Sequence, residues 1–132
     1  MDDVVYLDSS AILKLIFEEP ETEALVTLLR ARPLRASSSL ARVEVLRTAA
    51  TVQDRTVLQH ARAVLARLHL IRPDDRILTT AMTCEPWELK SRDAIELATA
   101  LSLGHHLAGI VVYNRRLAEA ARHHGLTVWA PA

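Results

Sequence analysis

The sequence is short of the residues that build covalent frameworks and irregular loops. Its 132 residues include one cysteine, three glycines and five prolines. A single cysteine excludes an internal disulfide framework and fits a reducing compartment. So few glycines and prolines argue against disorder and against a loop-rich β fold. The chain is therefore expected to fold around an ordinary hydrophobic core, as a single domain over residues 1–132.

Aromatic residues, net charge and long apolar runs are also scarce. Aromatic residues make up 4% of the chain, so we expect a core of Leu, Val, Ile and Ala. Sixteen basic residues balance sixteen acidic ones. Any binding of nucleic acid would therefore depend on local charge and a bound metal ion, not on a globally basic surface. No apolar run approaches a membrane span and no signal-peptide pattern opens the chain, so we expect a cytoplasmic protein that does not contact membranes.

What the sequence does contain is an alternation of short apolar runs and amphipathic helices. The pattern predicts strands at residues 4–7, 34–37, 70–71, 109–113 and 126–129. It predicts helices at residues 11–16, 20–30, 40–50, 55–68, 77–84, 92–103 and 117–124, of which the third and fourth form a helical hairpin. Strands that alternate with helices in this way indicate a parallel sheet covered by helices.

Several helix ends are predicted from single residues. Ser9 or Ser10 is expected to cap the first helix, and Pro20 is expected to be the first residue of the second. Ser91 is expected to cap the helix at residues 92–103, and Gly104 to close it.

Polar residues stand where these elements meet. Asp8 follows the first strand, at the carboxyl edge where open α/β sheets bind ligands, and Asn114 follows the other long apolar strand. Asp93 and Glu96 are three residues apart and so share one helix face, while Glu44 lies beside the apolar face of its own helix. Taken singly, the two aspartates are also explained by helix termini, and Glu44 by a solvated surface position.

Carboxylates from three segments would repel one another in one cleft unless a cation joined them. Mg²⁺ and Mn²⁺ bind carboxylate, amide and water oxygens, and such ions lower the pKa of bound water. Spacing alone does not bring the groups together. A divalent metal site at the end of the first strand is therefore a hypothesis.

Four segments together resemble the motifs of a known family. They are residues 8–11 (DSSA), 39–45 (SLARVEV), 91–100 (SRDAIELATA) and 112–121 (VYNRRLAEAA). In this order they resemble PIN-domain ribonucleases, specifically the VapC-type toxins of bacterial toxin–antitoxin pairs. The third segment is the most specific, and the resemblance covers nearly the whole chain. It implies a single PIN domain over residues 1–132, with a three-layer α/β/α fold, a short-stranded, mostly parallel sheet and a helical hairpin.

The resemblance also implies a function. The implied function is that of a toxin endoribonuclease of a type II toxin–antitoxin pair. Such an enzyme hydrolyses phosphodiester bonds with Mg²⁺ or Mn²⁺. Asp8, Glu44 and Asp93 would be its catalytic and metal-binding residues, with Asn114 and Glu96 as weaker metal ligands. A VapB-type antitoxin, a transfer or ribosomal RNA substrate and a second copy of the chain in a homodimer would be its partners. The alternative is a non-catalytic PIN-like module that mainly binds an antitoxin.

Two positions depart from the family's pattern. Asn114 stands where the family usually has aspartate, and its amide offers an oxygen without a charge. Glu96 stands where many relatives have histidine, and our hypothesis is that Glu96 partly replaces the missing charge. Arg115 and Arg116 come next in the chain, where they either hold RNA phosphates or begin a solvated helix.

The remaining conspicuous residues have plainer interpretations. Cys84 is expected to be a buried structural thiol, and Trp87 and Trp129 are expected to serve packing or an interface. No glycine-rich phosphate loop is present in the sequence, so use of a nucleoside triphosphate is not expected.

Overall fold

The fold is built on a five-stranded parallel sheet. The computed structural model describes residues 3–132. Its strands are β1 (Val4–Leu7), β2 (Arg35–Ser38), β3 (His69–Ile71), β4 (Leu107–Val111) and β5 (Val128–Trp129). They lie in the order β3-β2-β1-β4-β5, and every neighbouring pair is parallel. The two long apolar runs of the sequence are therefore neighbours at the centre of the sheet, and the prediction of a parallel sheet is confirmed.

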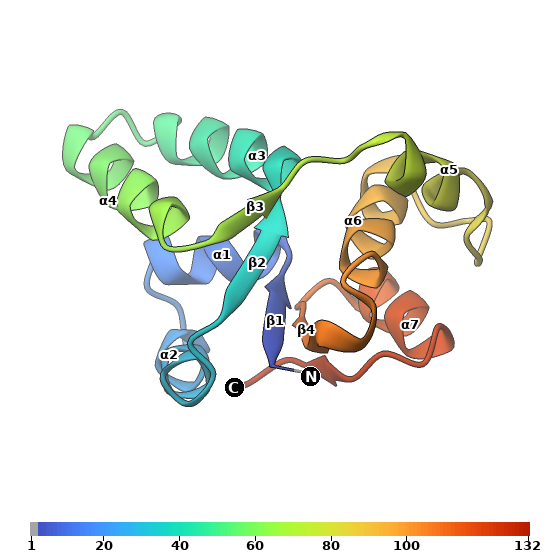
Figure 1. Cartoon of the computed structure of the whole chain (residues 1–132). Helices are drawn as coiled ribbons and strands as arrows, with labels where there is room; N and C mark the ends of the chain where they lie inside the picture. Colours follow the sequence, from blue (N-terminus) through green and yellow to red (C-terminus); the bar gives the residue numbers. More distant parts are fainter. Residues whose placement is uncertain (1–2) are drawn as a thin grey trace.

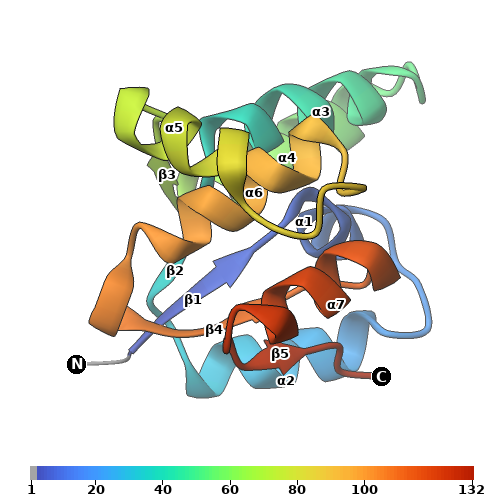
Figure 2. The same cartoon turned by 90° about the vertical axis from the view of Figure 1, so that its right-hand side faces the viewer.

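Helices cover both faces of this sheet. They are α1 (Ser9–Ile16), α2 (Thr22–Ala31), α3 (Ser39–Ala50), α4 (Arg55–Ala66), α5 (Asp75–Thr83), α6 (Ser91–Leu101) and α7 (Arg115–His123), with a 3₁₀ turn η1 (Gly104–His106) before β4. Helices α1 to α4 lie on one side and α5 to α7 on the other (Figures 1 and 2). The three-layer α/β/α fold and the hairpin of α3 and α4 are confirmed. None of the helices within residues 3–132 combines the length and the apolar character that a membrane span requires.

The sheet separates two hydrophobic cores. Val5, Leu7 and Val111 pack with helices α1 to α4, whereas Tyr6 and Ile110 pack with α6 and α7. Successive side chains of a strand point to opposite faces, so an unbroken apolar run supplies both cores. Burial of each large side chain of this kind stabilises the fold by about 1.5–3 kcal/mol.

The edge strand β5 packs closely against a glycine of β4. A Cβ atom at Gly109 would lie 2.7 Å from the indole ring of Trp129, so only glycine allows this approach. Trp129 also packs against the core of helices α1 to α4, which confirms its packing role. Trp87 is 71% exposed, so the packing interpretation is wrong for it and only the interface interpretation stays a prediction. Cys84 is a free thiol and is only partly buried.

The first helix begins earlier than predicted because an aspartate caps it. The Asp8 side chain accepts a hydrogen bond from the backbone N–H of Ala11, and α1 starts at Ser9. The expectation that Ser9 or Ser10 caps this helix is therefore wrong. Aspartate is as good a cap as serine, so propensity alone did not separate the two.

Four other expected boundaries are also wrong by one to three residues. Lys90 is the N-cap of α6 and makes no side-chain capping bond, so Ser91 is the first helical residue instead of the cap. Helix α6 ends at Leu101, and Gly104 begins the 3₁₀ turn with a φ of 56°. Helix α2 begins at Thr22, two residues after Pro20, and β4 begins two residues before the predicted run.

Candidate active site

Four carboxyl groups gather at the carboxyl end of β1. Asp8 follows β1, Glu44 lies on α3 directly after β2, and Asp93 and Glu96 lie on α6. The charges of Asp8, Glu44 and Asp93 all raise the pKa of Glu96, because the four groups are close together. The fold therefore brings together the carboxylates that the sequence places in three distant segments.

Asp8 is a buried carboxyl group, 4% exposed. Its Oδ1 atom accepts hydrogen bonds from the N–H of Ala11 at 3.0 Å and from the hydroxyl of Ser10 at 2.6 Å. The Ser10 hydroxyl in turn accepts a bond from the N–H of Tyr113, which follows β4. Burial raises the pKa of Asp8 to about 6, although its two hydrogen bonds act in the opposite direction. Asp8 thus caps α1 through one oxygen while its charged form remains costly without a cation.

Arg92 joins two of the predicted metal ligands. Its Nη1 donates to Oε2 of Glu44 at 2.7 Å, and its Nη2 lies 3.3 Å from Oδ1 of Asp93. Asp93 is buried, whereas the Arg92 side chain is 54% exposed at the surface of the cluster. A single guanidinium therefore links α3 to α6 and supplies one positive charge to four carboxyl groups.

Glu96 is the most deeply placed of the four, at 2% exposure. Its Oε1 accepts a hydrogen bond of 2.5 Å from the hydroxyl of Tyr6, and its Oε2 is buried with no hydrogen-bond partner. Burial above all, and the neighbouring carboxylates with it, raise the pKa of Glu96 to about 8. Burial and Glu96 together hold the pKa of Tyr6 well above its usual range. Without a bound cation, burial therefore favours the protonated form of Glu96.

Asn114 caps α7 and contacts Asp93. Its Oδ1 accepts hydrogen bonds from the N–H groups of Arg116 at 3.0 Å and Leu117 at 3.3 Å, and its Nδ2 donates to Oδ2 of Asp93 at 3.4 Å. An aspartate here would repel Asp93, whereas the amide donates to it. The geometry makes Asn114 an orienting residue for Asp93, and its role as a metal ligand stays a prediction.

The two predicted RNA-binding arginines lie beside this group. Arg115 and Arg116 are exposed in the first turn of α7, immediately after Asn114. Their position fits either interpretation that the sequence left open, so a role in holding RNA stays a prediction.

The four carboxyl groups are the right type of ligand for a hard divalent cation. Their side chains do not, however, converge on a single position. Within residues 3–132, no three His, Cys, Asp or Glu side chains are gathered closely enough to hold a metal ion. All four donors are carboxyl groups, the ligand type that Mg²⁺ and Mn²⁺ prefer. Two of their oxygens, Oε1 of Glu44 and Oε2 of Glu96, are buried and have no hydrogen-bond partner. Such unpartnered buried oxygens are rare in folded proteins, and a cation would satisfy them.

Sequence reasoning missed the roles of Tyr6 and Arg92. It treats Tyr6 only as part of an apolar strand, yet a hydroxyl inside such a run needs a buried partner. Tyr6 also lies two residues before Asp8 and therefore faces the same side of the sheet. Arg92 carries no comparable signal, because its partner Glu44 lies 48 residues away in the sequence.

Comparisons with known proteins agree with this geometry. The PIN domain family profile matches residues 5–123. The chain is 45% identical to Ribonuclease VapC46 of Mycobacterium tuberculosis over 128 residues, which are 97% of this chain and 98% of the relative. It is 34% identical to Ribonuclease VapC47 and 40% identical to Ribonuclease VapC35 of the same species, each over 97% of both chains.

A solved structure shows the same fold. A toxin–antitoxin complex from Klebsiella pneumoniae superposes with a TM-score of 0.74, at 22% identity, over 97% of this chain and 98% of that one. Fold, length and sequence thus agree, and the chain belongs to the VapC-type branch of the PIN domain family.

Proposed function

We propose that this chain is the toxin of a type II toxin–antitoxin pair, an endoribonuclease that hydrolyses RNA phosphodiester bonds with Mg²⁺ or Mn²⁺. The observation that carries the proposal is the group of four buried or half-buried carboxyl groups at the carboxyl edge of a PIN sheet, with two oxygens left unpartnered. The names of the three ribonuclease relatives support the reaction class.

Asp8, Glu44 and Asp93 would hold the cation. When bound, a divalent ion supplies Lewis-acid stabilisation of the charge that develops on the phosphodiester, and it lowers the pKa of a water molecule at the site. The three side chains come from α3, α6 and the end of β1, so the sheet and its two flanking layers fix their positions. Asn114 orients Asp93 through its amide, and Arg92 stands at the exposed side of the cluster, where an RNA phosphate would approach.

Glu96 would supply part of the charge that Asn114 lacks, with Tyr6 holding it in place. Glu96→Gln keeps an acceptor for the Tyr6 hydroxyl but removes the charge. We expect this variant to bind Mn²⁺ more weakly and to cleave RNA more slowly, while Asp93→Asn abolishes both. The hypothesis for Glu96 is wrong if Glu96→Gln leaves both properties unchanged while Asp93→Asn removes them.

Two substitutions at Asp8 test the reaction itself. Asparagine is a good helix cap, so Asp8→Asn keeps the start of α1 and removes only the charge, whereas Asp8→Ala removes both. Cleavage of total RNA with Mn²⁺ should fall by about 100-fold or more in both variants, since a lost metal ligand costs at least as much as a lost outer-shell partner. Metal-free protein should be inactive. Cleavage by Asp8→Asn at the wild-type rate would contradict the proposal.

The partners and the location of the protein are proposed from its membership of the family. We propose a VapB-type antitoxin, a transfer or ribosomal RNA substrate, a homodimer and a cytoplasmic location for a single-domain protein. The Klebsiella pneumoniae complex with the same fold supports an antitoxin partner. A wild-type chain that binds Mn²⁺ and antitoxin but cleaves no RNA would favour the non-catalytic module instead.

A further inference from the structure

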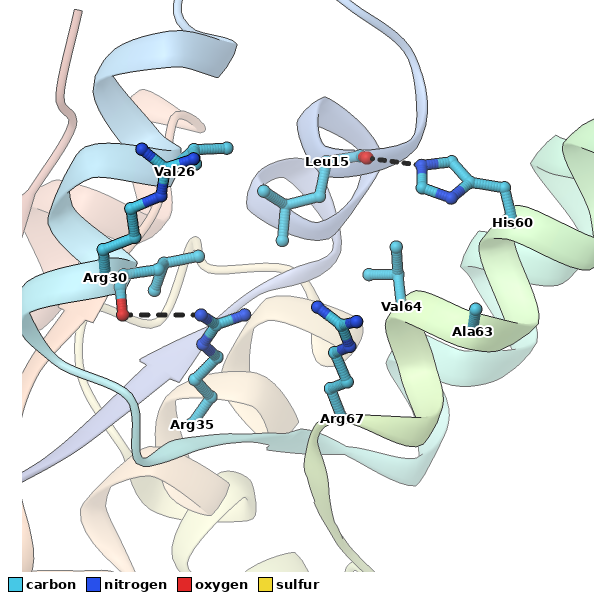
Figure 3. Close-up of a pocket in the computed structure, with 9 residues that line it drawn as sticks. Leu15, Val26, Arg30, Arg35, His60, Ala63, Val64 and Arg67 are labelled. Atoms are coloured by element: carbon cyan, nitrogen blue, oxygen red, sulfur yellow. Dashed lines mark hydrogen bonds between the residues drawn. The ribbon is translucent and has the colours of Figure 1, made fainter.

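A cavity lined with arginine lies on the α2 and α4 side of the sheet (Figure 3). It measures about 350 Å³, and Arg30, Arg35, Arg67 and His60 form its polar wall. Val26 and Val64 belong to its apolar wall. Among the described residues that line this arginine pocket, none is acidic, so its positive charge is not balanced from within.

Arg35 and Arg67 form the centre of the arginine pocket. Their guanidinium groups point the same way into the space between α2 and α4 (Figure 3). Arg35 donates from Nη2 to the carbonyl oxygen of Leu29 at 3.4 Å, but its Nε is buried with no hydrogen-bond partner. Burial, and the nearby charge of Arg67, lower the pKa of Arg35. An unpaired buried N–H and two neighbouring like charges both cost free energy, and a bound anion would remove the second cost.

The wall chemistry suits a phosphate group. The two unesterified oxygens of an RNA phosphodiester match a guanidinium fork, and each oxygen can accept a further hydrogen bond from a second guanidinium. Here the guanidinium groups of Arg35 and Arg67 lie side by side in a cavity that Arg30 also lines, and His60 is fixed at its rim by a 3.1 Å contact to the carbonyl of Leu15. The cavity volume falls within the usual range of about 300–1,000 Å³ for small-molecule sites, and the apolar wall suits a sugar or base beside the phosphate.

We propose that the arginine pocket binds a phosphate of the RNA substrate at a distance from the bond that is cut. This inference rests on the proposed ribonuclease function. Arg35 begins β2 at the amino end of the sheet, whereas Asp8 follows β1 at the carboxyl end. Arg35 pairs with Val5, and Asp8 follows three residues later, a rise of about 10 Å, so an RNA that reaches both sites spans the sheet. Because the chain has no net charge, its attraction for RNA must come from local groups such as this one.

The test measures RNA binding without catalysis. Fluorescence anisotropy with a labelled single-stranded RNA is carried out on the full chain in EDTA, so neither cleavage nor a metal bridge contributes. We expect Arg35→Gln and Arg67→Gln each to weaken binding about tenfold, and to reduce the slope of log K against log salt by about 1. Arg62→Gln is the matched control, because Arg62 is an exposed arginine of α4 outside the pocket.

The other possible results of this experiment decide whether the pocket binds RNA. Arg67 is exposed, so Arg67→Gln keeps the test valid if Arg35→Gln fails to fold. Equal RNA affinity in Arg67→Gln, Arg62→Gln and wild type overturns the proposal. Unchanged RNA affinity with lost thermal stabilisation by adenosine monophosphate assigns the pocket to a free nucleotide and overturns the RNA assignment. Unchanged RNA affinity with weaker antitoxin binding makes it a protein-docking site and also overturns it.

The ribonuclease function and the phosphate site can be refuted independently of each other. If wild-type protein shows no metal-dependent cleavage but the pocket variants still lose RNA affinity, the phosphate site stands and the ribonuclease assignment falls. If wild-type protein cleaves RNA and the pocket variants bind and cleave it equally well, only the phosphate site falls.

Discussion

The two ends of the sheet hold unbalanced charge of opposite sign. At the carboxyl end, the guanidinium of Arg92 pairs with two of the four carboxyl groups, those of Glu44 and Asp93. In the arginine pocket, the described lining includes three arginines and no acid. The equal totals of acidic and basic residues conceal this separation. A net charge of zero therefore says little about what a chain of this kind attracts.

The two ends also differ in how they respond to pH. Burial raises the pKa of Asp8 to about 6 and that of Glu96 to about 8. The carboxyl end of the sheet therefore loses negative charge as the pH falls through this range. An arginine stays charged at any pH at which the protein is folded, even where burial lowers its pKa. The carboxyl groups at the carboxyl end are thus sensitive to protons, and the arginines of the pocket are not.

The largest effect is expected from Glu96→Gln on stability. Glu96 has a pKa of about 8 in the folded chain against an ordinary value of 4.5. The stabilisation from its retained proton is complete below the ordinary value and is lost as the pH rises toward the folded value. The free energy of unfolding of the metal-free wild type should therefore fall by a few kcal/mol, about 3, between about pH 5 and about pH 8.

Glu96→Gln should remove most of that slope and stabilise the chain near neutral pH, although it weakens metal binding. Urea unfolding at several pH values measures this, with Glu88→Gln at an exposed position as the matched control. An unchanged pH slope in Glu96→Gln would show that Glu96 is not the group that makes the carboxyl end of the sheet sensitive to protons.

The next effect is expected from Arg92→Gln on metal affinity. Arg92 neutralises Glu44 and Asp93, two of the proposed ligands. Its removal should tighten Mn²⁺ binding by about tenfold, the equivalent of about 1.4 kcal/mol, because the carboxylates lose a competing cation. Calorimetric titration measures the affinity, with Arg42→Gln as the control on the exposed side of α3. Weaker Mn²⁺ binding in Arg92→Gln would show that the guanidinium orders the ligands instead of competing with the metal.

The smallest effect is expected from Arg116→Gln on RNA affinity. Arg116 is exposed and contributes its backbone, not its side chain, to the cap by Asn114. A single exposed phosphate contact should be worth about threefold or less in binding at physiological salt. Anisotropy under the conditions used for the arginine pocket gives the comparison. A larger loss in Arg116→Gln than in Arg67→Gln would place the main RNA contact beside the carboxylates and remove the contrast between the two ends.

The sequence alone was sufficient to predict the strand and the helix that position the carboxyl groups at the carboxyl end of the sheet. An unbroken apolar run followed by Asp8 predicts a central strand with a carboxylate at its tip, and the spacing of Asp93 and Glu96 predicts a shared helix face. Both features depend on neighbours in the chain, and both are present in the structure. The motif resemblance added Glu44, which periodicity alone leaves as a surface residue.

The contacts between distant segments could not be predicted in this way. Tyr6 meets Glu96 across 90 positions of sequence, and Arg92 meets Glu44 across 48. The arginine pocket depends on how α2 lies relative to α4, and its arginines follow no period that would mark them as a group. Such pairs are set by packing between elements, which propensity and spacing do not determine.

The strand order has a consequence for synthesis of the chain. Strand β1 is made first, but its neighbour β4 comes after α6, near the end of the sequence. A nascent chain that has not yet reached α6 carries Asp8 and Glu44 without Asp93, and its first strand lacks one of its two partners. Pairings of such sequence separation form late and slowly. If the chain is the toxin we propose, the ribosome that translates it is exposed to an active nuclease only once almost the entire protein has emerged.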